Sequence, residues 1–268
     1  MNLPEKLYKF ESFSELSLRN LKRQAIYFGS PRGFNDPYDC AITAQINNLN
    51  PEQVEQYKNN LLVDGKTPIE VKSYLTTNTE HEIGEFVKKI VAATIPGLKE
   101  DFISQCGISC FSEINNDLLM WSHYGGRYKG FCLEFDSKKP PFNRARKVTY
   151  TYSMPEVDPM GFLLEGQGPT DFIDLFCIKS KSWEYEKEWR VFHKQAGTLF
   201  TYPTEALTGV FFGPDIEPEC LEIIALILRG QNEKVKLFQG KRSQESFKVE
   251  FIEVDYTTNL DAKKMGLR

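Results

Sequence analysis

The stretch that decides the fold is GISCFSEINNDLLMWSHYGGRYKGFCLEF, residues 107–135. Its first part, Gly107–Ser112, and its last part, Gly130–Phe135, are short apolar runs of the kind that form buried strands. Between them the pattern across Asp117–Tyr124 predicts a short helix. The stretch therefore predicts a strand, a helix and a second strand around one core.

Further strands and helices are predicted on both sides of this stretch. Short apolar runs between turn-forming residues predict strands, and amphipathic segments that follow capping residues or proline predict helices. We predict the strands Leu7–Phe10, Ala25–Phe28, Glu188–His193, Gly209–Phe212 and, last in the chain, Phe247–Val254, with helices at Leu16–Arg23 and Pro218–Arg229. This order of elements predicts an α/β or α+β fold.

The segment between the second and third strands has a helical pattern. Pro51 and Pro68 are typical of helix starts, and the apolar residues Phe86 and Ile90 are spaced for one helix face. No repeat, low-complexity tract or linker separates parts of the chain. We therefore predict one domain over residues 1–268 with a helical insertion over residues 51–105.

Composition limits the classes of partner. The chain has 33 basic and 37 acidic residues and a formal net charge of −4, so charge gives no case for nucleic acid. No apolar run is long enough for a signal peptide or a membrane span, and we expect a cytoplasmic protein without membrane contact. The six cysteines include no CxxC pair, so we expect buried thiols and no metal.

The densest group of candidate functional residues is the segment Trp183–Arg190. On an extended segment the carboxylates of Glu184, Glu186 and Glu188 would share one side, because strand side chains repeat every second residue. Such crowding favours either neutralisation by nearby cations such as Arg190 or a cationic ligand or transition state. The structural alternative is a charged edge strand that resists aggregation.

Three other segments carry candidate residues. Met120–Tyr124 contains Trp121 and His123 and is expected to lie mostly in the core. Asn35 lies in a loop rich in turn-forming residues. Its side chain either shapes this turn by hydrogen bonding to the local backbone, or the loop frames the mouth of a pocket. Lys9 stands in an apolar strand, where a lysine faces water, a partner or an anionic ligand.

Five motifs together resemble a bacterial family, domain of unknown function 2971. They are Leu7–Phe10, Phe34–Pro37, Cys110–Ser112, Met120–Tyr124 with Gly130, and Glu186–Arg190. The resemblance runs from the first strand to about Gly213, with the helical insertion as the variable part. That family has no established activity.

The order of a polar residue in the first strand, a serine-bearing second motif and a late Glu-x-Glu is also similar to ADP-ribosyltransferases. This resemblance implies an α+β fold with a mixed or antiparallel split β-sheet core, and NAD as substrate. It implies Glu188 as the residue that faces the oxocarbenium charge and Glu186 as the residue that orients or activates the acceptor. The implied NAD-contacting residues are Lys9, Tyr8, Ser112, Trp121, Tyr124, Asn35 and Arg190. Lys9 stands where those enzymes have Arg or His.

The resemblance further implies an unidentified acceptor, which is a protein, a nucleic acid or a small molecule, and a role as a toxin or an anti-phage defence component. Two other functions remain open from the residues. One is a non-catalytic ligand-binding or sensor module whose carboxylates bind a cationic ligand or partner. The other is a nuclease that holds Mg²⁺ with Glu184, Glu186 and Glu188.

Overall fold

The structure is a computed structural model that describes residues 2–40, 50–155, 173–232 and 234–267. The chain divides into two compact units, where the sequence predicts one domain. The first unit contains Met1–Gly33, Cys106–Tyr150 and Lys181–Arg268, and the second contains Phe34–Gln105 and Thr151–Ser180.

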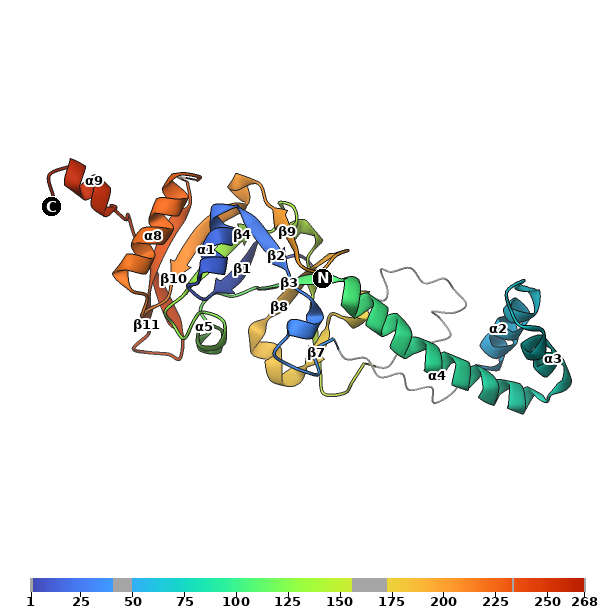
Figure 1. Cartoon of the computed structure of the whole chain (residues 1–268). Coiled ribbons are helices and arrows are strands. Elements are labelled where there is room, and N and C mark those ends of the chain that lie inside the picture. The colour runs from blue at the N-terminus through green and yellow to red at the C-terminus, as the bar shows by residue number, and fades with distance from the viewer. Residues whose placement is uncertain (1, 41–49, 156–172, 233, 268) are drawn as a thin grey trace. The chain divides into compact units, whose positions relative to one another are not determined.

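The core of the first unit is an open sheet (Figure 1). Among the described residues it has eight strands in the order β12-β11-β10-β4-β1-β3-β8-β5. Their bounds are β1 Lys6–Glu11, β3 Gly107–Ser112, β4 Phe131–Asp136, β5 Arg146–Lys147, β8 Glu188–His193, β10 Leu207–Phe212, β11 Lys236–Arg242 and β12 Val249–Glu253. β10 and β11 are parallel and the other neighbours are antiparallel. The sheet is therefore open, mixed and mostly antiparallel, which agrees with the mixed or antiparallel sheet of the expected α+β fold.

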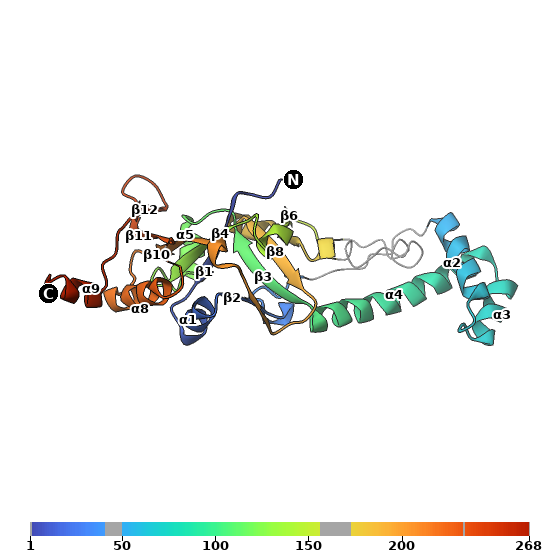
Figure 2. The ribbon, with the colours of Figure 1, turned by 90° about the horizontal axis from the view of Figure 1, so that it is seen from above.

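The two faces of this sheet are buried by different helices. On one face, α1 (Glu15–Lys22) and α8 (Pro218–Arg229) pack their apolar sides against the largest hydrophobic cluster, and we call it the α8 face (Figure 2). On the other, α5 (Leu118–His123) contributes Trp121 to a second cluster, and we call it the α5 face. Side chains therefore alternate along β1: Leu7 joins the α8-face cluster, whereas Tyr8 and Phe10 join the α5-face cluster.

Capping residues fix where two of these helices begin. The Ser14 side chain accepts a hydrogen bond from the Ser17 amide and starts α1. Asp117 accepts from the amides of Leu119 and Met120 and starts α5. Both helices lie where the sequence predicts them, because the polar cap and the apolar stripe are local signals.

The first unit has further short elements. They are β2 (Ala25–Phe28), which pairs with β9 (Thr198–Thr201), the 3₁₀ turns η1 (Pro31–Gly33), η2 (Phe142–Arg144) and η4 (Thr204–Ala206), and the helix α9 (Asn259–Lys264). The predicted last strand, Phe247–Val254, is β12, but α9 follows it. The sequence-based prediction also missed β11.

The second unit is mainly helical. It contains α2 (Pro51–Val63), α3 (Ile69–Thr77) and α4 (Glu80–Gln105), together with the strand β7 (Ile178–Ser180), while β6 (Thr149–Thr151) lies where the two units join in sequence. The three helices cover the predicted insertion. Lys179 and Asp39 form a buried ion pair at 3.3 Å in this unit. In the part of the chain that the structure describes, no helix combines the length and apolar character that a bilayer crossing needs.

Candidate functional site

Four polar side chains form one row across four neighbouring strands. Tyr8 of β1 pairs in register with Glu134 of β4 on one side and with Ser112 of β3 on the other. Ser112 also pairs with Glu188, the first residue of β8. Directly paired residues of antiparallel strands point to the same face, so this central row lies on the α5 face. Since neighbouring strands are about 4.8 Å apart, the backbones of Tyr8 and Glu188 are about 10 Å apart.

Arg190 holds the carboxylate at the end of the central row. Its Nε donates a hydrogen bond to Glu188 Oε1 at 2.7 Å, and its Nη2 donates to Oε2 at 3.0 Å. The exposed fractions of the two side chains are 4% for Glu188 and 0% for Arg190. Such two-bond pairs between ions are strong and directional. Arg190 therefore fixes the orientation of Glu188 and offsets its charge.

The segment before β8 is not extended, so the prediction that three carboxylates share one side of a strand is wrong. Residues Lys181–Glu186 form the 3₁₀ helix η3, and Lys187 has a left-handed backbone with φ of 47°. Glu184 pairs with Lys181 at 2.7 Å and is half-exposed. Glu186 and Glu188 are buried. Only the last two carboxylates of the segment therefore lie at the candidate site.

Two neighbouring elements hold Glu186 in place. The Tyr124 hydroxyl at the end of α5 donates to Glu186 Oε1 at 2.6 Å. Ser112 Oγ donates to the Glu186 carbonyl at 2.6 Å and accepts from the Ile114 amide at 3.1 Å. Ser112 therefore contributes to the central row by fixing the backbone just before Glu188.

Ser112→Ala is expected to lower the free energy of unfolding by about 1–3 kcal/mol. The variant leaves the buried Glu186 carbonyl and Ile114 amide without this partner, and a buried polar group without a partner costs about that much. Urea unfolding measures the change. Ser153→Ala, at an exposed position, serves as the control and should stay close to wild type. Equal stability of Ser112→Ala and wild type would contradict this role.

Buried and partly buried groups around Arg190 complete the local environment. Cys110 pairs in register with Arg190, and burial raises the pKa of its thiol well above the usual value, with Glu188 adding to the effect. Cys110 therefore remains a neutral thiol. On the other side of the strand, Trp189 Nε1 donates to Glu113 at 2.7 Å.

The structure does not bring every predicted site residue to the central row. Lys9 pairs with Leu133 on the α8 face, with its Nζ 5.2 Å from the Phe111 ring centroid, so it lies on the opposite face from Glu188. Asn35 belongs to the second unit. Trp121 is on the α5 face but is fully buried, and its Nε1 donates to the Asn115 carbonyl at 2.7 Å.

Sequence reasoning missed two residues of the site. Glu134 is the fourth member of the central row. Tyr150 accepts a hydrogen bond from the Glu188 amide through its hydroxyl oxygen at 2.8 Å. A signal for Glu134 was available, because it is the only charged residue in the apolar run Phe131–Phe135 and a charged residue inside a buried strand needs a partner.

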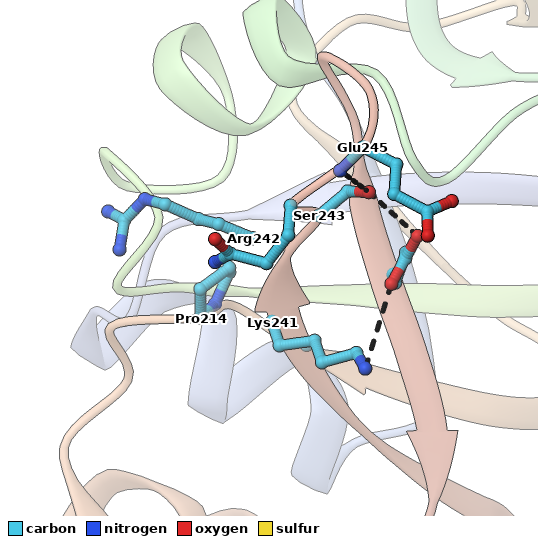
Figure 3. Close-up of a pocket in the computed structure, with 8 residues that line it drawn as sticks. Pro214, Lys241, Arg242, Ser243 and Glu245 are labelled. Carbon is cyan, nitrogen blue, oxygen red and sulfur yellow. Dashed lines mark hydrogen bonds and ion pairs between the residues drawn. The ribbon is translucent and has the colours of Figure 1, made fainter.

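A separate polar pocket of about 700 Å³ lies at the turn between β11 and β12 (Figure 3). Ser243 Oγ donates to Glu250 at 2.7 Å, and Lys241 lies 3.7 Å from the same carboxylate. Arg242 extends away from Lys241 in this view and pairs with Asp215. Four strands separate β11 from β8 in the sheet order, so this pocket does not contain the central row.

Comparison with known proteins identifies one family. Residues 120–191 match the model of a family described as protein of unknown function (DUF2971), which confirms the predicted resemblance to that family over these residues. The matched segment contains Trp121, Tyr124, Glu186, Glu188 and Arg190. Neither the curated proteins nor the solved structures contain a significant match.

Proposed function

We propose that this chain is an ADP-ribosyltransferase-like protein that cleaves NAD between nicotinamide and ribose and transfers ADP-ribose to an acceptor. The observation that carries the proposal is the central row, in which Tyr8, Ser112 and Glu188 come from three neighbouring strands and point to one face. The resemblance to ADP-ribosyltransferases depends on three features. They are a polar residue in the first strand, a second strand that carries a serine, and a Glu-x-Glu motif late in the chain. In this row Tyr8 takes the place that the sequence assigned to Lys9.

The residues of the site fit this chemistry. When the bond between C1′ and the nicotinamide nitrogen breaks, its electron pair goes to nicotinamide and leaves positive charge on the ribose. A fixed carboxylate stabilises that charge electrostatically, and Glu188 is such a group because Arg190 and the Tyr150 contact hold it. The acceptor then forms the new bond to C1′ and gives up its proton. Glu186 is the carboxylate that takes this proton.

The burial of both carboxylates sets a condition on ligand entry. Glu186 and Glu188 are each 3% exposed, and Tyr124 of α5 bonds directly to Glu186. A ribose therefore reaches Glu188 only after neighbouring side chains move, and we propose that the Tyr124–Glu186 contact is the one that opens. In this proposal the described state is closed, and NAD binds an open state of the same site.

Nicotinamide release from NAD by the purified protein, with cell lysate as a source of acceptor, tests the proposal. Wild type is expected to release nicotinamide. Glu188→Gln is expected to reduce release by about 100- to 1000-fold, the range for loss of one group that stabilises charge in a transition state. Glu250→Gln, which neutralises a carboxylate on β12 far from the central row, should release nicotinamide at the wild-type rate.

The Glu188 variant needs a folding control, because it leaves Arg190 buried beside a neutral amide. Thermal unfolding shows whether the variant is folded. Glu186→Gln is a second variant, since its amide oxygen still accepts the Tyr124 hydrogen bond, and it should slow transfer to the acceptor. No release by wild type, or full release by folded Glu188→Gln, would refute the proposed activity.

The Glu188–Arg190 pair is also the observation that favours a second function, a non-catalytic ligand-binding or sensor module. A carboxylate that already has a buried counter-ion is a stable structural element. Binding of NAD without any nicotinamide release would support this second function over the first.

A further inference from the structure

Glu134 lies at the other end of the central row. Its contacts have no part in the proposed transfer of ADP-ribose. Its Oε1 accepts a hydrogen bond from Thr208 Oγ1 at 2.6 Å, and its Oε2 accepts from the Tyr8 hydroxyl at 3.1 Å. Lys6 Nζ lies 3.3 Å from Oε1 and donates to Thr208 Oγ1 at 2.9 Å. The side chain is 15% exposed. Glu134 is therefore held from two directions before any ligand binds.

These contacts decide what the Tyr8 hydroxyl can do. A phenol has one proton to donate and oxygen lone pairs that accept. Burial raises the pKa of Tyr8 and the Glu134 carboxylate raises it further, so the phenol stays protonated at neutral pH. Its single proton is directed at Glu134. Toward any third group, the Tyr8 oxygen is consequently a hydrogen-bond acceptor.

We propose that Glu134 is a positioning residue that fixes Tyr8 as a hydrogen-bond acceptor, so that this end of the site binds an N–H or O–H donor of the ligand. This inference rests on the proposed function, in which the donors are the carboxamide of nicotinamide and the ribose hydroxyls. The ionised phosphate groups of a dinucleotide are excluded as partners of the Tyr8 oxygen, because they offer only acceptors.

The location of Tyr8 supports this role. It lies two strands from Glu188 on the same face, a separation of about 10 Å. Between the two side chains this spacing suits a ligand fragment of the size of a nicotinamide ring with its ribose. In this proposal the ligand turns C1′ toward Glu188 and its carboxamide or a ribose hydroxyl toward Tyr8. The ring of Tyr8 is fixed edge-on against Phe211, with centroids 5.9 Å apart.

Equilibrium binding of two dinucleotides tests the inference. The probes are NAD and nicotinic acid adenine dinucleotide, which has a carboxylate in place of the carboxamide. Glu134→Gln turns an amide N–H₂ toward Tyr8 and occupies its oxygen, and Tyr8→Phe removes that oxygen. Each is expected to weaken NAD binding roughly 3- to 10-fold, the value of one hydrogen bond. The double variant should bind no more weakly than Tyr8→Phe alone.

The matched control is Tyr256→Phe, which removes a hydrogen bond of the same kind, from a tyrosine hydroxyl to Glu222 of α8, outside the central row. It should bind NAD within about twofold of wild type, because the acceptor role of Tyr8 is unchanged. A loss confined to NAD identifies the carboxamide as the donor. Equal losses for both dinucleotides identify a ribose hydroxyl.

Two failures are distinguishable. If wild type binds neither dinucleotide, the proposed function is wrong. If wild type binds NAD and Tyr8→Phe binds it equally well, the role of Tyr8 and Glu134 is wrong while the proposed function stands. The Tyr8→Phe result decides the question even where Glu134→Gln fails to fold, since phenylalanine keeps the ring and its packing.

Discussion

Replacing Arg190 with methionine is expected to lower the free energy of unfolding by about 3–5 kcal/mol, the cost of leaving a buried ion without its partner. The Arg190 side chain is 0% exposed and both of its bonds to Glu188 lie inside the first unit. The expected fall in melting temperature is on the order of 10 °C. Thermal and urea unfolding of the purified variant measure it.

A double variant distinguishes the contribution of the ion pair to stability from the contribution of side-chain packing. Arg190→Met with Glu188→Leu leaves no buried charge, and replacing both members of a buried pair by apolar residues is often close to neutral. We expect the double variant to recover most of the stability that Arg190→Met loses. Arg242→Met breaks the exposed pair with Asp215 and is expected to change stability much less. Equal effects of Arg190→Met and Arg242→Met would contradict the prediction.

Trp121→Ala is expected to lower the free energy of unfolding by about 3–5 kcal/mol, the range for deleting a large buried aromatic side chain. Trp121 is fully buried on the α5 face, with ring centroids 5.2 Å from Phe10 and 5.9 Å from Phe251. Its indole N–H also satisfies the Asn115 carbonyl. Urea unfolding measures the loss.

Trp121→Phe is the matched variant, because it keeps an aromatic ring in the same place and loses only part of the volume and the hydrogen bond. It should lose much less stability than Trp121→Ala. If Trp121 instead contacts NAD, as the sequence resemblance implies, Trp121→Ala would weaken NAD binding while the protein remains stable. Stable Trp121→Ala protein would therefore overturn the core assignment.

Local signals were enough to predict most elements of the fold. β8 begins at Glu188 and α8 spans Pro218–Arg229, both as predicted, because an apolar pattern and a helix-starting proline are read within one segment. β11 was missed. Its sequence KLFQGKR mixes charged, polar and apolar residues, and most of it is half-buried or exposed, so it lacks the apolar run that marks a buried strand.

The candidate site was harder to predict than the fold. Sequence reasoning selected Tyr8, Ser112, Glu186 and Glu188, but it assigned the first-strand role to Lys9. Adjacent residues of a strand point to opposite faces, so the choice between Tyr8 and Lys9 depends on the register with β3, which no local pattern contains. The left-handed backbone conformation of Lys187 could likewise not be predicted from the sequence, since lysine has no preference for that conformation.

The place of β1 in the sheet order has a consequence for how the protein is made. β1 is made before its neighbours β3 and β4, which come only after the helices of the second unit. Until then both of its edges expose unpaired amides and carbonyls, and closing such long loops slows folding. The nascent chain therefore passes through a long period in which β1 is open to aggregation or to a chaperone.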